Sequence, residues 1–226
     1  MTRKYWGRPC SATGCHKQTI GHSKHCQTHR SVDRRWGHPL QAPMTKGELT
    51  RLSKHVTRLI NSRPNSADLW CKLREALKQL KREARAVVAE IKPGFPVFDK
   101  EAGPNLIILQ TLVDAEPDKV IAAMIAIGYV AGIDRHRFKN DDAYFMAAGR
   151  RLYLLSRAHF EGHINPATGK RHFVCKEPNS KNVLAVGRKM MAAFGAFGLR
   201  LALIEERDER HADDVRKAPL MALSSP

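Results

Sequence analysis

Long hydrophobic runs are missing from this 226-residue sequence. The two longest apolar stretches cover residues 120–133 and 190–204, and the second contains Arg200. A helix that crosses a bilayer needs about 20 apolar residues, so both stretches predict buried core helices and no contact with a membrane. No apolar segment follows the basic and polar residues 1–9. We therefore expect no signal peptide and a location in the reducing cytoplasm.

Cysteine and acidic residues are also scarce. The sequence has 5 cysteines, an odd number that does not suit a scaffold held by disulfides. It has 39 Lys and Arg against 22 Asp and Glu, a net charge of +17. Residues 1–92 carry 20 basic and 6 acidic side chains (net +14), whereas residues 93–226 carry 19 and 16 (net +3). This excess indicates a polyanionic partner, with DNA favoured and RNA as an alternative, for the first part of the chain.

Aliphatic residues are few in residues 1–44, so this segment needs another source of stability. Three cysteines and a histidine there are spaced as Cys-x4-Cys-x10-Cys-x2-His, and thiolate and imidazole are ligands that zinc prefers. We predict a closed, structural zinc site formed by Cys10, Cys15, Cys26 and His29. Two alternatives remain: unliganded cysteines in a basic tail, or a fourth ligand taken from His16, His22 and His25.

Three arginines and a tryptophan follow the predicted zinc site directly. Arginine forks contact phosphates or guanine edges, and a tryptophan ring packs on sugars or bases. We therefore predict nucleic-acid contacts from Arg30, Arg34, Arg35 and Trp36. The competing interpretation is a solvated basic helix with Trp36 buried in a small local core.

This segment resembles the small zinc modules, similar to treble clefs or knuckles, of bacteriophage and mobile-element DNA-binding proteins. The resemblance covers about 40 of the 226 residues. It rests on Cys10, Cys15, Cys26, His29, Arg34, Arg35, Gly37 and Pro39. Some such modules are joined to an HNH nuclease, but no His-Asn-His set follows the zinc ligands in this sequence. The resemblance implies DNA binding and gives no support to nuclease activity.

A basic helical hairpin is predicted for residues 45–92. Thr45 and Glu48 fit a capping box, and apolar residues at helical spacing follow as far as residue 60. After a turn at residues 61–65, a second helix of residues 66–91 has an apolar line on one side. Its polar side predicts phosphate contacts from Lys72, Arg74, Lys78, Lys81, Arg82 and Arg85.

The second part of the chain predicts a helical domain with a nearly neutral surface. We expect a linker at residues 93–104, a helical domain at 105–217 and a flexible tail at 218–226. The expected helices cover residues 105–113, 117–133, 140–160 and 180–217, and a short strand is expected at 172–175. The overall prediction is a mainly α protein: a zinc module at 1–44, the hairpin at 45–92, and a helical domain that dimerises or binds a protein partner.

The favoured function is a non-enzymatic, zinc-stabilised DNA-binding protein of a bacterial, phage or mobile-element system, acting as a regulator or as a subunit of a nucleoprotein complex. No catalytic residue is predicted. One alternative is a metal-dependent nuclease that uses the region of residues 159–172, where His159, Glu161, His163 and His172 lie close in sequence. Another is an RNA-binding subunit of an RNA-guided complex.

Overall fold

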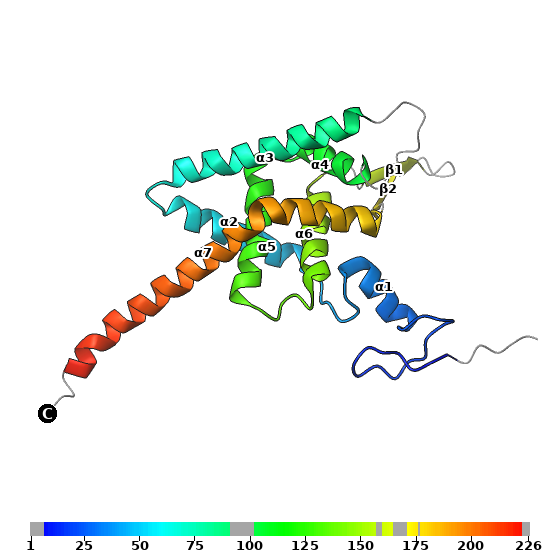
Figure 1. Cartoon of the computed structure of the whole chain (residues 1–226), viewed down its shortest axis with the longest axis horizontal. Coiled ribbons are helices and arrows are strands. Elements are labelled where there is room, and N and C mark those ends of the chain that lie inside the picture. The colour runs from blue at the N-terminus through cyan, green and yellow to red at the C-terminus, as the bar shows by residue number, and fades with distance from the viewer. Residues whose placement is uncertain (1–6, 91–101, 157–159, 165–170, 176, 223–226) are drawn as a thin grey trace, which may run out of the picture.

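A computed structural model describes residues 7–90, 102–156, 160–164, 171–175 and 177–222. In this part of the chain it contains seven helices and one two-stranded sheet (Figure 1), which confirms the prediction of a mainly α fold. The helices are α1 (Gln27–Trp36), α2 (Lys46–Asn61), α3 (Ser66–Ala89), α4 (Ala102–Asp114), α5 (Pro117–Ile133), α6 (Asp141–Leu155) and α7 (Ser180–Ala222). The strands are β1 (Phe160–Ile164) and β2 (Arg171–Cys175).

Local sequence signals explain where several helices begin. The Thr45 hydroxyl accepts a hydrogen bond from Glu48 N (3.1 Å), and the Glu48 carboxylate accepts one from Thr45 N (3.2 Å), which completes the predicted capping box of α2. Pro117 occupies the first turn of α5, where its missing N–H costs nothing. Asn140 caps α6 by accepting a hydrogen bond from Ala143 N at 2.8 Å.

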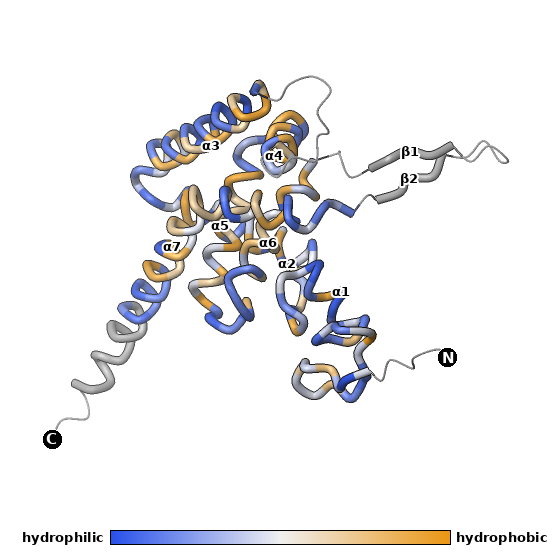
Figure 2. Tube along the Cα trace, turned by 45° about the vertical axis from the view of Figure 1, so that its right-hand side comes forward, coloured by the Kyte–Doolittle hydropathy of each residue, from blue (hydrophilic) through white to orange (hydrophobic). Residues whose placement is uncertain are grey.

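Helix α5 forms the centre of the molecule. Every residue from 120 to 130 is buried, as expected for a helix that is apolar on all sides. Glycines allow α5 and α7 to approach backbone to backbone, because a Cβ on Gly128 would lie 2.6 Å from the carbonyl oxygen of Gly195. Figure 2 shows α4 and α5 as largely hydrophobic, whereas α1 is largely hydrophilic.

The helical hairpin α2–α3 shares this core. A single hydrophobic cluster contains Val56 of α2, Leu73 of α3, Ile121 of α5 and Phe194 of α7. The hairpin and the later helices therefore stabilise each other, although the charge is concentrated on the first part of the chain. We call residues 44–211 the helical body, and residues 7–37, which end at the close of α1, the Cys/His module.

Two helices extend beyond the bounds predicted for them, 105–113 and 180–217. The linker was expected to reach residue 104, but α4 already begins at Ala102, and its first turn is buried. Gly103 lies so close to α7 that a Cβ there would be 2.2 Å from the Asn182 amide, so this turn is held by packing. Residues 93–101 of the predicted linker lie outside the described residues. The tail was expected from residue 218, but α7 runs to Ala222, because extending an existing helix is far easier than starting one.

The helix predicted for residues 140–160 is too long. α6 ends at Leu155, since Ser156 is already extended (φ −84°, ψ 158°). Strand β1 follows and pairs antiparallel with β2, so the strand expected at residues 172–175 is confirmed. Residues 157–159 of the predicted helix lie outside the described residues.

No helix in the described part of the chain combines the length and the apolar character needed to cross a membrane.

Candidate metal centre

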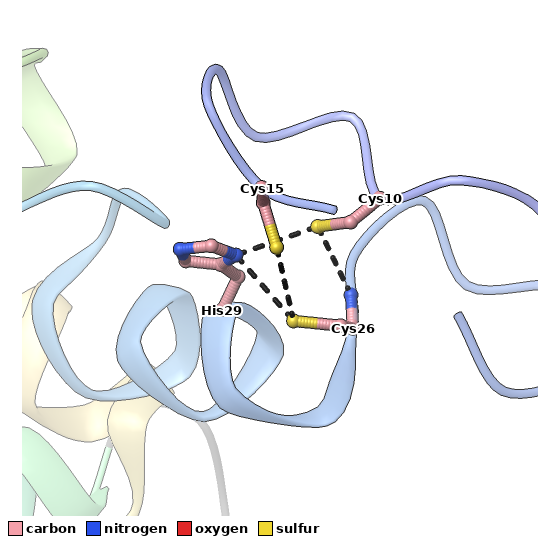
Figure 3. A group of neighbouring side chains, drawn as sticks. All are labelled: Cys10, Cys15, Cys26 and His29. Atoms are coloured by element: carbon pink, nitrogen blue, oxygen red, sulfur yellow. Dashed lines mark hydrogen bonds between the residues drawn. The ribbon is translucent and has the colours of Figure 1, made fainter. Parts of the chain in front are cut away.

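The side chains of Cys10, Cys15, Cys26 and His29 converge on one point (Figure 3). Their ligand atoms all lie within 4.8 Å of one another. Among the described residues, this is the one group of three or more His, Cys, Asp or Glu side chains that can hold a metal ion. The four residues are the predicted ligands. The alternative histidines, His16, His22 and His25, are not part of the group.

A short antiparallel bridge between Pro9 and Gln18 positions the first two cysteines. Within it, Cys10 N donates a hydrogen bond to the Lys17 carbonyl at 3.0 Å. Cys15 N donates to the Ala12 carbonyl, also at 3.0 Å, which closes a turn between the cysteines. The turn passes through Gly14 at φ 75°, a left-handed conformation that favours glycine. Both thiols are thus turned toward the same side of the loop.

Helix α1 supplies the other two ligands. Cys26 is its N-cap residue, and the Cys26 carbonyl accepts a hydrogen bond from Arg30 N at 2.9 Å. Residues three apart lie on the same face of a helix, which brings His29 over Cys26. The His29 Nδ1 atom lies 3.4 Å from the Sγ atoms of both Cys26 and Cys10 (Figure 3).

The distances between these atoms match a tetrahedral ion site. Metal–sulfur bonds of about 2.3 Å and metal–nitrogen bonds of about 2.0 Å give a tetrahedron with S···S edges of about 3.8 Å and S···N edges of about 3.5 Å. The structure has 3.9 Å between the Sγ atoms of Cys15 and Cys26, and 3.4 Å for the two S···N distances. These three of the six edges have tetrahedral lengths, and none of the others exceeds 4.8 Å.

The electrostatics of the thiols also favour a cation. Burial opposes ionisation of Cys10, but hydrogen bonds from Cys26 N, from Ala12 N and from His29 outweigh it and lower the pKa of Cys10 to about 5. The Lys17 amide favours the thiolate of Cys15, yet burial and the neighbouring sulfurs of Cys10 and Cys26 raise the pKa of Cys15 above its usual value. A divalent cation resolves this conflict because it stabilises all three thiolates at once.

Arg35 and Trp36, predicted to contact nucleic acid, lie against the helical body. The Arg35 guanidinium is 2.8 Å from the Glu177 carboxylate, and Arg150 of α6 reaches the same carboxylate at 3.3 Å. Arg150 also donates a hydrogen bond to the Arg35 carbonyl, and its Cζ atom lies 4.8 Å from the centre of the Trp36 ring. Trp36 is half-buried by this contact with α6.

Gly37 brings the end of α1 onto the start of α6. It closes α1 in the left-handed region at φ 75°, and a Cβ there would lie 2.6 Å from the backbone of Asp142. The side chain of Asn140 donates a hydrogen bond to the Gly37 carbonyl at 3.1 Å. We call the contacts of Arg35, Trp36 and Gly37 with the helical body the junction. Sequence reasoning missed Arg150 and Glu177, because no local pattern links them to residues more than 100 positions earlier.

Arg30 and Arg34 differ from their neighbours on α1. Both are exposed, and neither has a carboxylate partner among the described residues. Their positive charges therefore face solvent without compensation, next to the Cys/His cluster that begins the helix.

Most basic residues of α3 have acidic partners. Lys81 and Arg85 have none within the described part of the chain. The others form exposed ion pairs, so the accessible positive charge of α3 is smaller than its sequence indicates. The pairs are Lys72–Asp68 (2.8 Å), Arg74–Asp118 (2.7 Å), Lys78–Glu75 (3.6 Å) and Arg82–Glu75 (2.9 Å).

The region of the nuclease alternative is only partly described. His159 lies outside the described residues, as do residues 165–170. The backbone register of the hairpin places His163 directly opposite His172. This pairing leaves the alternative untested.

Comparisons with protein-family models, with curated proteins and with solved structures found no match to this chain. The candidate metal centre is therefore supported by its own geometry and donor chemistry. These agree with a small Cys/His module.

Proposed function

We propose that Cys10, Cys15, Cys26 and His29 bind one zinc ion, which keeps the Cys/His module folded. Three thiolates and an imidazole form a donor set that zinc prefers over harder cations. Four protein ligands leave no coordination position for a substrate, so the ion is structural. The module buries almost no other apolar side chain, which makes metal binding its main source of folding free energy.

Elemental analysis of the purified full-length protein tests this assignment. We expect about one equivalent of zinc, and loss of most of it in His29→Asn because one of four ligands is gone. The matched control is His16→Asn, an exposed histidine of the same module outside the cluster, which should retain the zinc. Absence of zinc from the wild-type protein, or equal zinc in both variants, contradicts the assignment.

In this proposal the Cys/His module holds α1 in position to contact duplex DNA. The observation that carries this proposal is that the Cys/His cluster lies at the start of α1 and the junction at its end, while Arg30 and Arg34 are exposed and have no carboxylate partner among the described residues. A helix held in this way positions its arginines before binding, so little entropy is lost when they contact phosphates. The net charge of +14 in residues 1–92 adds a long-range attraction to a polyanion.

The surroundings of two tryptophans favour a duplex over a single strand. Proteins that bind single strands stack bases on accessible aromatic rings. Arg150 lies over the Trp36 ring, and Trp70 is only 8% exposed, at the wall of a groove between helices, so neither ring forms an open platform for a run of bases. The resemblance of the module to phage and mobile-element zinc modules points to DNA as well. In this proposal the protein is a regulator or a nucleoprotein subunit of such a system and is not an enzyme.

A salt titration of duplex binding, followed by fluorescence anisotropy, tests the proposal. Each phosphate contact contributes about −0.9 to the slope of log affinity against log salt, so Arg30→Gln with Arg34→Gln should make the slope shallower by about 1.8. The affinity at fixed salt should fall at least about tenfold. The control is Arg207→Gln, because Arg207 is an exposed arginine in the second half of α7, and the C-terminal part of this helix projects away from α1 (Figure 1). Absence of duplex binding at about 150 mM salt contradicts the proposal.

Two additional assays would assign a different function. Complete displacement of the duplex by a small excess of RNA would indicate an RNA-binding subunit. Nicking of plasmid DNA in the presence of Mg²⁺ or Mn²⁺, abolished by His163→Ala, would indicate the nuclease.

Residues 105–217 provide the contact with a protein partner or with a second copy of the chain. Apolar side chains are exposed near the place where the end of α5 meets α7: Ile133 is 55% exposed, Leu199 40% and Leu203 58%. Such a patch on a nearly neutral part of the chain suits association. Sedimentation velocity of the full chain distinguishes a monomer from a dimer. Cysteines that form no disulfide and are kept as metal ligands suit a reducing compartment, so the proposed location is the cytoplasm.

A further inference from the structure

A groove of about 870 Å³ opens on the helical body, lined by residues of α2, α3, α5 and α6. Sites for small molecules usually enclose about 300–1,000 Å³. Its charged lining consists of five cations and one carboxylate. These are Lys54, Arg58, Arg74, Lys119, Arg151 and Asp118. Only Arg74 belongs to the residues proposed to contact DNA.

Two of the five cations form ion pairs. The Arg74 guanidinium donates two hydrogen bonds to the Asp118 carboxylate, at 2.8 and 2.7 Å. Lys119 pairs with Glu116 at 3.1 Å. The remaining three, Lys54 and Arg58 of α2 and Arg151 of α6, have no carboxylate partner in the described part of the chain. The groove therefore carries an uncompensated charge contributed from two sides.

Arg151 is the most unusual of the three. Its Nε atom is buried and has no hydrogen-bond acceptor. Burial disfavours the charged form and lowers the pKa of Arg151 below its usual value, although a guanidinium stays protonated at neutral pH. A half-buried cation without a partner costs folding free energy, and this cost falls when an anion binds beside it. The residue thus destabilises the free protein in a way that a ligand would relieve.

The rest of the groove is suited to the apolar part of a ligand. Trp70, Ala122 and Leu155 form its apolar wall. The indole is held in place because Trp70 Nε1 donates a hydrogen bond to the Asn61 side-chain oxygen at 2.8 Å. Three hydroxyl groups of α2 in the lining donate their hydrogens to backbone carbonyls one turn earlier, so they can only accept hydrogen bonds from a ligand. The anion must therefore be bound by the cations.

We propose that this groove binds a small organic phosphate. The phosphate lies between Lys54 and Arg58 on one side and Arg151 on the other, and the flat apolar body of the ligand packs along Trp70. The proposal does not depend on DNA binding, because the three cations lie outside the surface formed by α1. Its support is the combination of an open groove of ligand size, an apolar wall and three cations without a carboxylate partner among the described residues, one of them partly buried.

Isothermal titration calorimetry of the full-length protein with 2-naphthyl phosphate tests this site. The probe combines an aromatic body with a phosphate, whereas 2-naphthol and inorganic phosphate each supply one of the two. We expect 2-naphthyl phosphate to bind at least about tenfold more tightly than either fragment. No binding of 2-naphthyl phosphate, or equal binding of 2-naphthol, overturns the proposal.

Three variants identify the groove as the binding site. Arg58→Gln and Arg151→Met should each weaken 2-naphthyl phosphate at least about tenfold, because each removes a charge-assisted hydrogen bond. Arg51→Gln is the matched control: Arg51 lies exposed on the same helix as Arg58 but outside the lining, and its loss should leave the affinity unchanged. Unchanged affinity in Arg58→Gln, or an equal loss in Arg51→Gln, overturns the proposal even if Arg151→Met fails to fold.

Two further measurements distinguish a small-ligand site from a structural role of Arg151 and from a part of the DNA surface. Arg151→Met should raise the melting temperature of the ligand-free protein while abolishing binding, since it removes an unpaired buried charge. A lower melting temperature would mean that Arg151 has a structural role, and the argument from its cost would fail. An excess of duplex DNA should leave the affinity for 2-naphthyl phosphate unchanged. Displacement by the duplex would assign the groove to the DNA surface and overturn the proposal of a small ligand.

Discussion

The Cys/His module and the helical body show two ways in which one chain reaches a folded state. The module buries only three apolar residues in its own cluster, Cys10, Ala12 and Cys26, and two of these are candidate metal ligands. The body buries a whole helix, α5, among its neighbours. Burial of apolar area stabilises the body, whereas the module has too little of it and depends on its ligands. Metal removal should therefore affect one region and leave the other folded.

The two regions also differ in how they use positive charge. On α3 most basic side chains pair with carboxylates of α3 or α5. On α1, Arg35 forms an ion pair with Glu177 at the junction. Arg30 and Arg34 have no carboxylate partner in the described part of the chain. The number of basic residues alone therefore overstates the surface available to a polyanion. Among the described residues, two cations without a carboxylate partner remain on each helix: Arg30 and Arg34 on α1, and Lys81 and Arg85 on α3.

The largest expected effect is the loss of the module alone. Cys26→Ser removes a ligand that is also the N-cap residue of α1, so the variant should lose its metal and the fold of residues 7–37. Structural zinc sites contribute about 10–16 kcal/mol in isolated modules, far more than this segment can replace. Elemental analysis and hydrogen exchange should show an unfolded module and a protected body. The control Cys71→Ser, an exposed thiol of α3, should change neither.

A core substitution should destabilise the helical body and leave the Cys/His module folded. Phe194 of α7 is fully buried in the shared hydrophobic cluster, so Phe194→Ala should lower the free energy of unfolding of the body by about 3–5 kcal/mol. The metal content should stay unchanged. Urea unfolding measures the first quantity, and Phe197→Ala, a half-buried neighbour, should cost less. Loss of metal in Phe194→Ala would mean that the two regions fold as one unit.

The smallest effect is expected at the junction. Hydrogen bonding from Arg35, supported by Arg150, keeps the pKa of Glu177 below its usual range despite some burial, so its carboxylate is ionised at pH 7. The pairing is complete above the usual carboxyl pKa and is lost as the pH falls through the lowered value. Glu177→Gln imitates that loss at neutral pH.

The effect of Glu177→Gln on global stability should be small, because the ion pairs are exposed. We expect faster hydrogen exchange in α1, which is less firmly held against α6, with unchanged metal content. Glu90→Gln, an exposed residue at the end of α3, serves as the control. If α1 exchanges at the same rate in both variants, the contacts of Trp36 and Gly37 alone hold the module to the body.

Local spacing made much of the structure predictable. The ligands are close in sequence, and the helical geometry of α1 explains why His29, three residues after Cys26, completes the group in place of a neighbouring histidine. The starts of α2, α5 and α6 follow from Thr45, Pro117 and Asn140, which act on the backbone next to them. Such signals operate within a few residues, so they can be recognised without the fold.

The contacts that the sequence did not predict involve residues that are far apart in the chain. The predicted role of Trp36 did not anticipate Arg150, which covers its ring, and the basic side of α3 did not reveal that Asp118 of α5 pairs with Arg74. The cations of the groove were missed for the same reason. Lys54 and Arg58 have helical spacing, but nothing near them in sequence indicates Arg151.

The sequence by itself determined the helical class, the starts of α2, α5 and α6, and the four candidate ligands, because each depends on periodicity, capping or spacing over 20 residues or fewer. Tertiary structure decided the ion pairs between segments that are distant in the chain, such as Arg74–Asp118 and Arg35–Glu177. Ion pairing and burial depend on distances between helices, and those are set by the packing of α5 against α2, α6 and α7. The same packing leaves Arg30 and Arg34 facing solvent and encloses Arg151 beside the groove.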